Sequence, residues 1–398
     1  MRFQSYLNTA VSLITNYYGN IPLVHYLKNY FAQNKKHGSK DRKAITHLCY
    51  CYFRLGKSLN EVTFEEKIKI ALYLCHNKIN EYGILYNNNW LANWHSSLAQ
   101  RIDFVQKNYP NFSIHSIFVF TDLLSEGICK EEFVLSFFNQ PQLFLRVRPN
   151  YLQTVLQKLQ AAAIAYKLLN NNCIALPNTT KVDAILQVNK DVVIQDYSSQ
   201  QIAQYYEIVL SALNVNNYST HKPLLVWDCC AASGGKSILL LDTFPNIKLT
   251  VSDIRESILI NLAKRFKEAG INNYQSFVTD LSKEQQDIKF NKYQFIVCDV
   301  PCSGSGTWGR TPEQIQFFTN EKLNNYTLLQ QKITLQAAKH LNKNGFFLYI
   351  TCSVFTTENE DIVKFLLANT ALQLVQMQNI VGYNNNADTM FVALFKNV

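Results

Sequence analysis

The sequence predicts an α/β protein whose larger part is a Rossmann-like domain with a mostly parallel, doubly wound sheet. Three observations indicate this fold class. From about residue 206 onward, short hydrophobic runs typical of buried strands alternate with helical segments. The first of these runs leads into a Gly-rich turn, and polar residues follow the later ones. Upstream, two segments of different character, 1–140 and 141–205, predict separate modules.

Residues 1–140 predict an all-helical region. Apolar residues recur there at helical spacing, for example in Asp41–Leu48 and in the segment CYCYFRLGK that follows it. An Asn-rich break at 87–89 and a Tyr-Pro-Asn turn at 109–111 divide the region. We find no repeat of fixed period.

Residues 141–205 predict a small α/β module with the order strand, helix, strand, strand, which is RRM-like. The first strand is LFLRVR after Pro141, and apolar residues between Leu152 and Tyr166 mark one face of the helix. The two further strands are expected at Cys173–Leu176 and Ala184–Val188. These strands lack the interleaved aromatic residues that stack bases in an RRM.

The Rossmann-like part, residues 206–398, is predicted from its strands. The expected strands are Leu224–Asp228, Lys248–Asp253, a run around Phe277, Tyr293–Asp299 and Gly345–Thr351. The expected helices are Ser237–Leu241, a charged helix that leads to Gly270, and a helix at about 326–341. Near-continuous hydrophobicity predicts that the last two strands are buried on both faces.

Composition and charge limit the function further. The chain has 398 residues, of which 47% are hydrophobic, and no segment approaches the 18 apolar residues of a membrane span. Its start lacks the pattern of a signal peptide, so we expect a cytoplasmic protein that does not bind membranes. The net charge is +5 over 1–140, +3 over 141–205 and +1 over the remainder. A basic upstream part suits a module that binds a polyanion.

Two of the ten cysteines stand out. The chain has no Cys-x-x-Cys, and no His at ligand spacing near its cysteines, so we expect no metal site and read most of these thiols as buried hydrophobes. Cys302, in Pro-Cys-Ser, and Cys352, in Thr-Cys-Ser, each follow a predicted parallel strand. The carboxyl ends of such strands share one crevice. Two thiols there favour covalent catalysis on a ring carbon over phosphoryl or hydride transfer.

The Gly-rich turn is DCCAASGGKS at 228–237. A P-loop requires Gly where this chain has Cys230, and the Gly-x-Gly-x-x-Gly of dinucleotide sites is absent. Asp253 ends the second strand, where such folds place an acid on a ribose hydroxyl, and Asp280 lies near the end of the third. This pattern predicts a ligand with a nucleoside but no pyrophosphate, and S-adenosylmethionine (SAM) is the natural candidate.

Four segments resemble the successive motifs of one family. DCCAASGGKS, VSDI, DVPCSGSGTWGRTPE and ITCSVFTTENED look like those of the NOP2/Sun (RsmB-like) family of RNA 5-methylcytosine methyltransferases. FLRVRPN and VIQDYSSQ extend the resemblance over about 141–398. Through GSKDRKAITHLCYCYFRLGK, residues 1–140 resemble the NusB-like RNA-binding region that precedes some bacterial members.

The resemblance implies a SAM-dependent class I methyltransferase domain over 206–398, a substrate-binding module over 141–205 and an RNA-binding region over 1–140. It implies methylation of cytosine C5 in structured RNA, most often ribosomal RNA. Cys352 would attack C6 of the ring, Cys302 would assist release, and Asp299 would contact the cytosine. The implied cofactor residues are Cys230, Ala231, Ala232, Ser233, Gly234, Gly235, Lys236, Asp253, Asp280 and Asp299.

Two positions depart from the family pattern. Ser233 stands where the family usually has Pro, which removes φ rigidity from the turn. Gly309 stands where an Arg often precedes Arg310, which removes one possible RNA contact. Neither change involves the two thiols, so we expect altered RNA contacts and retained catalysis. The basic residues that we single out as candidate RNA contacts are Arg42, Lys43, Arg54, Lys57, Arg146 and Arg148.

Alternatives stay open at this point. The substrate is ribosomal RNA or transfer RNA, or the chain is a non-catalytic RNA-binding ribosome assembly factor. DNA 5-methylcytosine enzymes carry their nucleophile in a Pro-Cys after the fourth strand, which would make Cys302 the attacking residue. A second cysteine after the fifth strand favours the RNA family, and we expect a monomer. The sequence does not identify the target cytosine.

Overall fold

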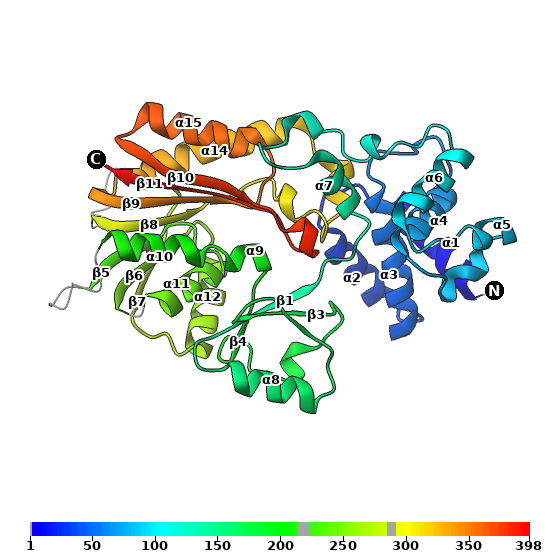
Figure 1. Ribbon diagram of the computed structural model, residues 1–398, viewed down its shortest axis with the longest axis horizontal. Helices are drawn as coiled ribbons and strands as arrows, with labels where there is room; N and C mark the ends of the chain where they lie inside the picture. Colours follow the sequence, from blue (N-terminus) through cyan, green and yellow to red (C-terminus); the bar gives the residue numbers. More distant parts are fainter. Residues whose placement is uncertain (1, 214–222, 245, 285–291) are drawn as a thin grey trace. The chain divides into compact units, whose positions relative to one another are not determined.

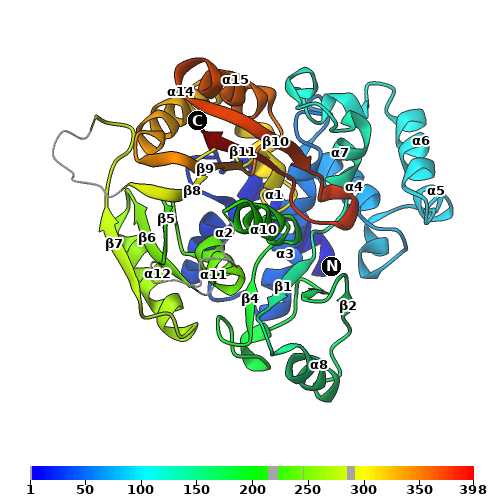
Figure 2. The same ribbon diagram turned by 60° about the vertical axis from the view of Figure 1, so that its left-hand side comes forward.

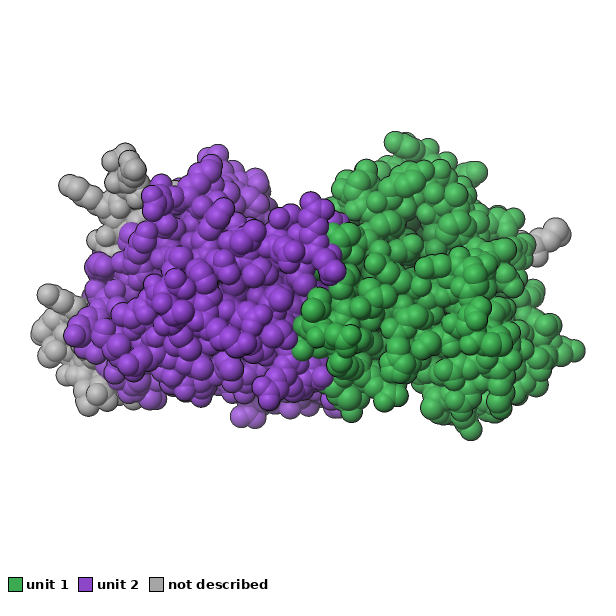
Figure 3. Space-filling view, turned by 90° about the horizontal axis from the view of Figure 1, so that it is seen from above, with its two compact units in different colours: residues 1–124, 129–140, 307–319 green, residues 125–128, 141–306, 320–398 purple. Residues whose placement is uncertain are grey.

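The computed structural model describes residues 2–213, 223–244, 246–284 and 292–398. It divides into two compact units, coloured separately in Figure 3. Unit 1 comprises residues 1–124, 129–140 and 307–319, and unit 2 comprises residues 125–128, 141–306 and 320–398. The three-part division predicted from the sequence, with boundaries at 140 and 205, stays a prediction.

Unit 1 is built from helices. They are α1 (Arg2–Thr15), α2 (Leu23–Gln33), α3 (Ser39–Arg54), α4 (Phe64–Cys75), α5 (Asn88–Ala92), α6 (Leu98–Asn108), α7 (Lys130–Ser136) and α13 (Glu313–Phe317), with 3₁₀ turns at Glu81–Leu85, Ile114–Ser116 and Thr121–Leu123. Local sequence explains where they begin. At α4, the Thr63 hydroxyl accepts the Glu66 N–H, and the Glu66 carboxylate accepts the Thr63 N–H, which forms a capping box.

A segment that is remote in sequence completes the core of unit 1. Residues 307–319 follow Cys302 by only a few positions, yet they fold with the helices of residues 1–140. The ring of buried Trp308 lies 5.8 Å from that of Phe118, and the Phe318 ring lies 5.8 Å from that of Phe120. Buried Glu313 accepts the backbone N–H of Leu23 at the start of α2. The helical unit therefore includes part of the predicted methyltransferase motif.

Unit 2 begins with a four-stranded antiparallel sheet in the order β2-β3-β1-β4. Its elements are β1 (Leu143–Val147), α8 (Leu152–Ala161), β2 (Lys167–Leu168), β3 (Cys173–Leu176) and β4 (Val192–Ile194). The strand predicted at Ala184–Val188 is wrong, because Val182–Ala184 forms a 3₁₀ turn and Leu186 bonds back to Val182. Apolar side chains at this turn pack on the small core, which resembles a strand pattern in sequence.

The main sheet of unit 2 has seven strands in the order β10-β11-β9-β8-β5-β6-β7 (Figure 1). Its strands are β5 (Leu224–Asp228), β6 (Ile247–Asp253), β7 (Tyr274–Val278), β8 (Tyr293–Asp299), β9 (Leu341–Thr351), β10 (Leu372–Ile380) and β11 (Met390–Asn397). The five strands β5 to β9 pair in parallel, whereas β11 pairs antiparallel with both β9 and β10. The predicted mostly parallel sheet is confirmed.

Helices cover both faces of this sheet, as Figures 1 and 2 show. One core joins the sheet to α10 (Ala203–Ala212), α11 (Gly235–Thr243) and α12 (Glu256–Glu268). The opposite core joins it to α14 (Asn320–Ala338) and α15 (Glu360–Asn369), and a short helix α9 (Tyr197–Gln200) precedes α10. This doubly wound arrangement confirms the predicted Rossmann-like fold class. Within the described ranges, no helix is long and apolar enough to cross a membrane.

Candidate active site

Neighbouring parallel strands bring the two predicted cysteines together. β8 and β9 pair up to Asp299 and Ile350, and Val300 donates its N–H to the Ile350 carbonyl at 3.1 Å. Just beyond this register, Cys302 Sγ lies 3.2 Å from Cys352 Sγ, and the Cys352 N–H donates to Cys302 Sγ at 3.4 Å. Both thiols are partly exposed. The hydrogen bond with Cys352 and burial raise the pKa of Cys302 well above its ordinary value, so Cys302 holds its proton.

Gly306 allows the loop after Cys302 to approach its neighbours closely. Its N–H donates to the Cys352 carbonyl, and its own carbonyl accepts the N–H of Thr389, both at 2.9 Å. A Cβ at Gly306 would lie 1.9 Å from the Thr389 carbonyl oxygen. Only glycine therefore fits between the Cys352 loop and the strand that follows Thr389.

The predicted Gly-rich turn connects β5 to α11. Gly234 has φ +80°, and a Cβ there would lie 2.6 Å from the Phe266 ring, so both conformation and packing require glycine. Asp228 ends β5, and its Oδ2 accepts the Ser237 hydroxyl at 2.5 Å. Burial raises the pKa of Asp228 to about 7. Its Oδ1 is buried and has no hydrogen-bond partner among the residues that the structure describes.

Lys236 connects this turn to the cysteine loops. Its Nζ donates to Asp299 Oδ2 at 2.5 Å. Burial alone would lower the pKa of Lys236, but the Asp299 carboxylate outweighs burial and raises it. The first turn of α11 therefore reaches the carboxyl end of β8 through an ion pair.

One cavity of unit 2, about 310 Å³ in volume, lies against these groups. The predicted site residues that line it are Ala231, Ala232, Ser233, Gly235, Lys236, Asp299 and Cys352. The further lining residues are Ile194, Gln195, Asp196, Ser199, Asp228, Arg265, Asp388 and Met390. The cavity thus places the nucleophile candidate Cys352 and the Gly-rich turn on a shared surface. Its volume falls in the range of small-molecule sites, roughly 300–1,000 Å³.

Five predicted site residues lie outside this lining: Cys230, Gly234, Asp253, Asp280 and Cys302. Asp253 supports the turn, since its Oδ2 accepts the Ala232 N–H at 3.1 Å and its Oδ1 accepts Arg255 Nε at 3.0 Å. Asp280 accepts the hydroxyl of Ser282 at 2.6 Å. Cys230 accepts hydrogen bonds from Cys229 and Cys298, which lower its pKa.

Sequence reasoning missed Arg265, which lies on α12. Its Nη1 donates to the Ser233 carbonyl at 2.9 Å and to the Ser233 hydroxyl at 2.8 Å. At the position where the family usually has Pro, a guanidinium thus holds the turn in place of a pyrrolidine ring. No motif marks Arg265, because its role depends on how α12 packs beside the turn. The same holds for Gln195 and Asp388 in the cavity wall.

Three of the six basic residues proposed to contact RNA serve the fold. Arg54 is buried, and its guanidinium donates to the Asn139 carbonyl at 3.2 Å and to the Phe137 carbonyl. Arg146 is buried against Asp242, and Arg148 donates to the same carboxylate at 2.9 Å. The assignment of the buried Arg54 and Arg146 as RNA contacts is therefore wrong, whereas an RNA contact by the partly exposed Arg148 stays a prediction. Arg42 and Lys43 are exposed, and Lys57 is partly exposed.

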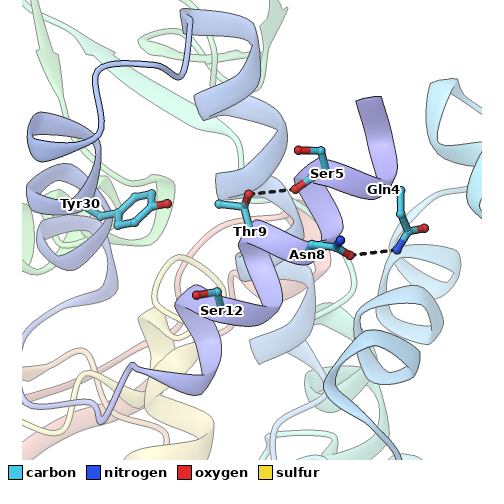
Figure 4. A pocket seen from close by; sticks show the side chains of 6 residues that line it. All are labelled: Gln4, Ser5, Asn8, Thr9, Ser12 and Tyr30. Carbon is cyan, nitrogen blue, oxygen red and sulfur yellow. Dashed lines mark hydrogen bonds between the residues drawn. The ribbon is translucent and has the colours of Figure 1, made fainter. Parts of the chain in front are cut away.

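A second hollow, about 480 Å³ in volume, lies in unit 1 (Figure 4). Its lining consists of Gln4, Ser5, Asn8, Thr9 and Ser12 of α1 with Tyr30 of α2. The Thr9 hydroxyl donates to the Ser5 carbonyl at 2.9 Å, and Gln4 Nε2 donates to Asn8 Oδ1 at 3.0 Å. Because the lining carries no thiol or carboxylate, we assign no catalysis to it. Among the described residues, no group of three or more His, Cys, Asp or Glu side chains is arranged to hold a metal ion.

Solved structures share the fold of this chain. PH0851 superposes with a TM-score of 0.70 at 18% identity, covering 99% of this chain and 98% of that one. NSun6 from Pyrococcus horikoshii, solved with SFG, has a TM-score of 0.56 at 12% identity, covering 68% and 94% of the two chains. These structures and the mostly parallel sheet confirm the predicted Rossmann-like fold.

Sequence comparisons identify the family. Residues 210–396 match the model described as 16S rRNA methyltransferase RsmB/F. The chain is 32% identical over 151 residues to ribosomal RNA small subunit methyltransferase B of Shewanella oneidensis, covering 37% of this chain and 34% of that protein. For the protein of the same name from Xylella fastidiosa, the identity is 28% over 238 residues, with 58% and 51% covered. A tRNA (cytosine(34)-C(5))-methyltransferase of Drosophila melanogaster is 30% identical over 175 residues, with 39% and 24% covered.

Residues 210–396, just under half of the chain, are thus similar to RsmB/F methyltransferases, and the resemblance to the NOP2/Sun (RsmB-like) family predicted from the motifs is confirmed. The chain spans no more than about half the length of these three curated relatives.

Proposed function

We propose that this protein is a SAM-dependent RNA methyltransferase that modifies C5 of cytosine through a covalent bond between Cys352 and C6 of the ring. One observation carries the proposal, namely the 3.2 Å separation of the Cys352 and Cys302 sulfur atoms beside a cavity that Cys352, Lys236 and Asp299 line. A reaction that needs only a nucleophile would require a single thiol. A pair at this distance suits a reaction in which one sulfur attacks the ring and the other assists its release.

The two thiols and Asp299 have distinct roles in this mechanism. The Cys352 thiolate forms a bond to C6, and the electron pair of the C5–C6 double bond moves onto C5, which becomes nucleophilic. Asp299, held by Lys236, contacts the ring and stabilises its charged form. Once C5 carries the methyl group, a base takes the C5 proton, the double bond forms again, the C6–S bond breaks, and the sulfur recovers its electron pair. Cys302 assists this release.

The residues around the cavity fit SAM. The buried Asp228 Oδ1, which lacks a partner among the described residues, is available to accept an N–H or O–H of a ligand. Ala231, Ala232, Ser233 and Gly235 line the cavity without large side chains. Asp253 and Asp280 lie outside the cavity lining. They would affect SAM binding indirectly, by fixing the backbone at the ends of their strands. Bound SAM supplies an electrophilic methyl group for C5.

We propose ribosomal RNA as the substrate, because ribosomal RNA small subunit methyltransferase B is the name of most of the relatives described above. The Drosophila melanogaster relative, named for a tRNA, supports transfer RNA as the second candidate. We propose that the exposed basic side chains of Arg42 and Lys43 in unit 1 contact the phosphates of the RNA. Binding should then weaken as salt rises, and the R42A/K43A double variant should reduce that salt dependence.

The decisive experiment tests each thiol separately. The purified Cys302→Ala protein, incubated with SAM and unmethylated RNA, should yield a protein–RNA adduct that survives denaturation, because release is blocked. Cys352→Ala should give neither adduct nor methylation, and Cys129→Ala, which alters an exposed thiol of unit 1, should behave as the parent does. Normal turnover by Cys302→Ala would refute its role in release.

The covalent adduct of the Cys302→Ala protein also identifies the class of nucleic acid that the protein modifies. Ribosomal RNA, transfer RNA and duplex DNA would be offered in competition to Cys302→Ala, and the RNA trapped on the protein would be sequenced. Trapping of DNA would overturn the proposal of an RNA enzyme. Calorimetric titration with SAM separates an enzyme from a non-catalytic assembly factor, because a scaffold need not bind SAM.

A further inference from the structure

Glu358 lies behind the two cysteine loops and is completely buried. It ends a 3₁₀ turn at Thr356–Glu358, just after the Cys352 loop. Its Oε1 accepts the Ser303 backbone N–H at 2.8 Å and Gln330 Nε2 at 2.9 Å. Its Oε2 accepts the hydroxyls of Ser303 and Ser353, both at 2.5 Å. Four donors therefore converge on one carboxylate.

These donors come from the loops that carry the reacting thiols. Ser303 follows Cys302, and Ser353 follows Cys352. The two serine hydroxyls also lie 3.2 Å from each other. Gln330 of α14 donates to the Pro301 carbonyl at 3.0 Å as well, so it holds the residue on the other side of Cys302. The carboxylate thus joins both loops at positions adjacent to the thiols.

Glu358 has no cationic partner, since no Lys, Arg or His forms an ion pair with it among the residues described. A buried carboxylate of this kind costs stability unless hydrogen bonds compensate for its lost hydration. Burial accordingly raises the pKa of Glu358, although the serine hydroxyls oppose this effect. The hydrogen bonds compensate for this cost only while Ser303, Ser353 and Gln330 surround the carboxylate, so the buried charge and the position of the two loops depend on each other.

We propose that Glu358 is a positioning residue that holds the Cys302 loop against the Cys352 loop and thereby sets the separation of the two sulfur atoms. Direct contacts also join the loops, among them the hydrogen bond from the Gly306 N–H to the Cys352 carbonyl and the 3.1 Å contact between the Ser305 and Ser353 hydroxyls. The Glu358 carboxylate differs from these contacts because it accepts from the residues that directly follow both cysteines. The effect of Glu358 on catalysis rests on the proposed function. Its effect on sulfur geometry is independent of that function.

Two substitutions separate the geometric role of Glu358 from its charge. In Glu358→Gln, the amide oxygen can accept from the Ser303 N–H and from Gln330, and the amide nitrogen can donate to the serine hydroxyl oxygens. This variant keeps the links between the loops and loses the charge. Glu358→Ala removes the links and leaves four donors without an acceptor. Asp361→Ala is the control, because it removes a partly exposed acid whose partner is Lys364.

The first readout is disulfide formation between Cys302 and Cys352, which requires no RNA and no SAM. Diamide takes two electrons and two protons from the pair and is reduced to the hydrazine, and mass spectrometry of unreduced peptides follows the bond. We expect Glu358→Ala to form this bond about tenfold more slowly than the parent, and Glu358→Gln and Asp361→Ala to form it within about twofold of the parent rate. Equal rates in Glu358→Ala and the parent would overturn the proposal.

The second readout is methylation. We expect kcat to fall about 100-fold in Glu358→Ala, with KM for RNA and SAM nearly unchanged, and Glu358→Gln to recover most of the rate. If the parent protein does not methylate RNA, the proposed function fails, while the disulfide experiment still tests the position of the sulfurs. If Glu358→Ala does not fold, S303A/S353A removes a donor from each loop and should slow the disulfide several-fold. A parental rate in that variant would refute the inference.

Discussion

Lys236 Nζ and Asp299 Oδ2 are 2.5 Å apart, and this ion pair joins the first turn of α11 to the end of β8. Both side chains line the cavity that also contains Cys352. The pair fixes the direction of a carboxylate that would otherwise be free to turn toward solvent. In the proposed mechanism, that carboxylate contacts the cytosine ring.

Lys236→Met should therefore impair methylation more than folding. Loss of the ammonium group leaves Asp299 without its partner, and we expect kcat/KM to fall about 100-fold. Methylation of RNA by radioactive SAM measures this loss, and thermal unfolding measures the change in stability. Lys264→Met, which alters an exposed lysine on α12, is the matched control. A parental rate in Lys236→Met would show that the ion pair has no part in the reaction.

Asp228 should make the free protein less stable at alkaline pH. Its pKa is about 7 in the folded protein, against about 4 in the unfolded chain. The folded state binds this proton more tightly, so the free energy of unfolding falls as pH rises from about 4 to 7 and stays low above that range. We expect Asp228→Asn to raise the melting temperature by at least about 3 °C at pH 8 and by less than half as much at pH 5.

A second variant, measured at the same two pH values, is the control. Asp361→Asn alters a partly exposed acid and should leave the difference between pH 5 and pH 8 unchanged. If Asp228→Asn lowered the melting temperature equally at both values, the carboxylate would be needed in its charged form for folding.

Arg265 should matter for the cofactor more than for RNA. Its hydrogen bonds to Ser233 hold the turn that lines the cavity, and a charged donor of this kind contributes about 1.5–3 kcal/mol. We expect Arg265→Gln to weaken SAM binding about tenfold, as measured by calorimetry, while RNA affinity stays at the parental value. Lys264→Gln on the neighbouring helix position provides the comparison. An equal loss in both variants would indicate a general effect of charge.

Removal of residues 1–140 should leave an insoluble protein. Within unit 1, Trp308 and Phe318 pack on Phe118 and Phe120, so truncation would expose the apolar side chains of 307–319. Replacing 307–319 in the truncated chain with a short Gly-Ser linker should restore solubility several-fold, as measured in cell lysates. If the simple truncation is soluble and folded, the packing of this segment does not stabilise the protein. Tests of RNA binding are therefore better made with point substitutions such as Arg42→Ala.

The sequence predicted most of the fold where strands are buried on both faces. The runs at Leu224–Asp228 and Tyr293–Asp299 coincide with β5 and β8, because parallel strands under two helical layers carry continuous apolar residues. The strands β10 and β11 were not predicted. β10 is an edge strand whose apolar residues, including Val375 and Met377, are largely exposed, so its sequence carries no clear alternation.

The candidate site was predictable where it consists of motifs. Cys302 and Cys352 follow strands whose pairing brings them together, as expected. Arg265 and Glu358 were not predicted as site residues, because their partners lie 32 and 55 positions away and only the folded chain makes them neighbours. Asp253 ends β6 and Asp280 follows β7, as expected, yet both lie outside the lining. Their carboxylates accept hydrogen bonds from Arg255 and Ser282.

The position of β11 has a consequence for synthesis of the protein. This strand lies between β9 and β10, and its residue Val392 pairs with Ile350, two positions before Cys352. A nascent chain that has emerged only as far as Ile380 leaves the outer edge of β9 unpaired, with its backbone groups open to other strands. The thiol pair can thus reach its final surroundings only late in translation. Early termination within this hairpin should yield an aggregating species instead of a partly active enzyme.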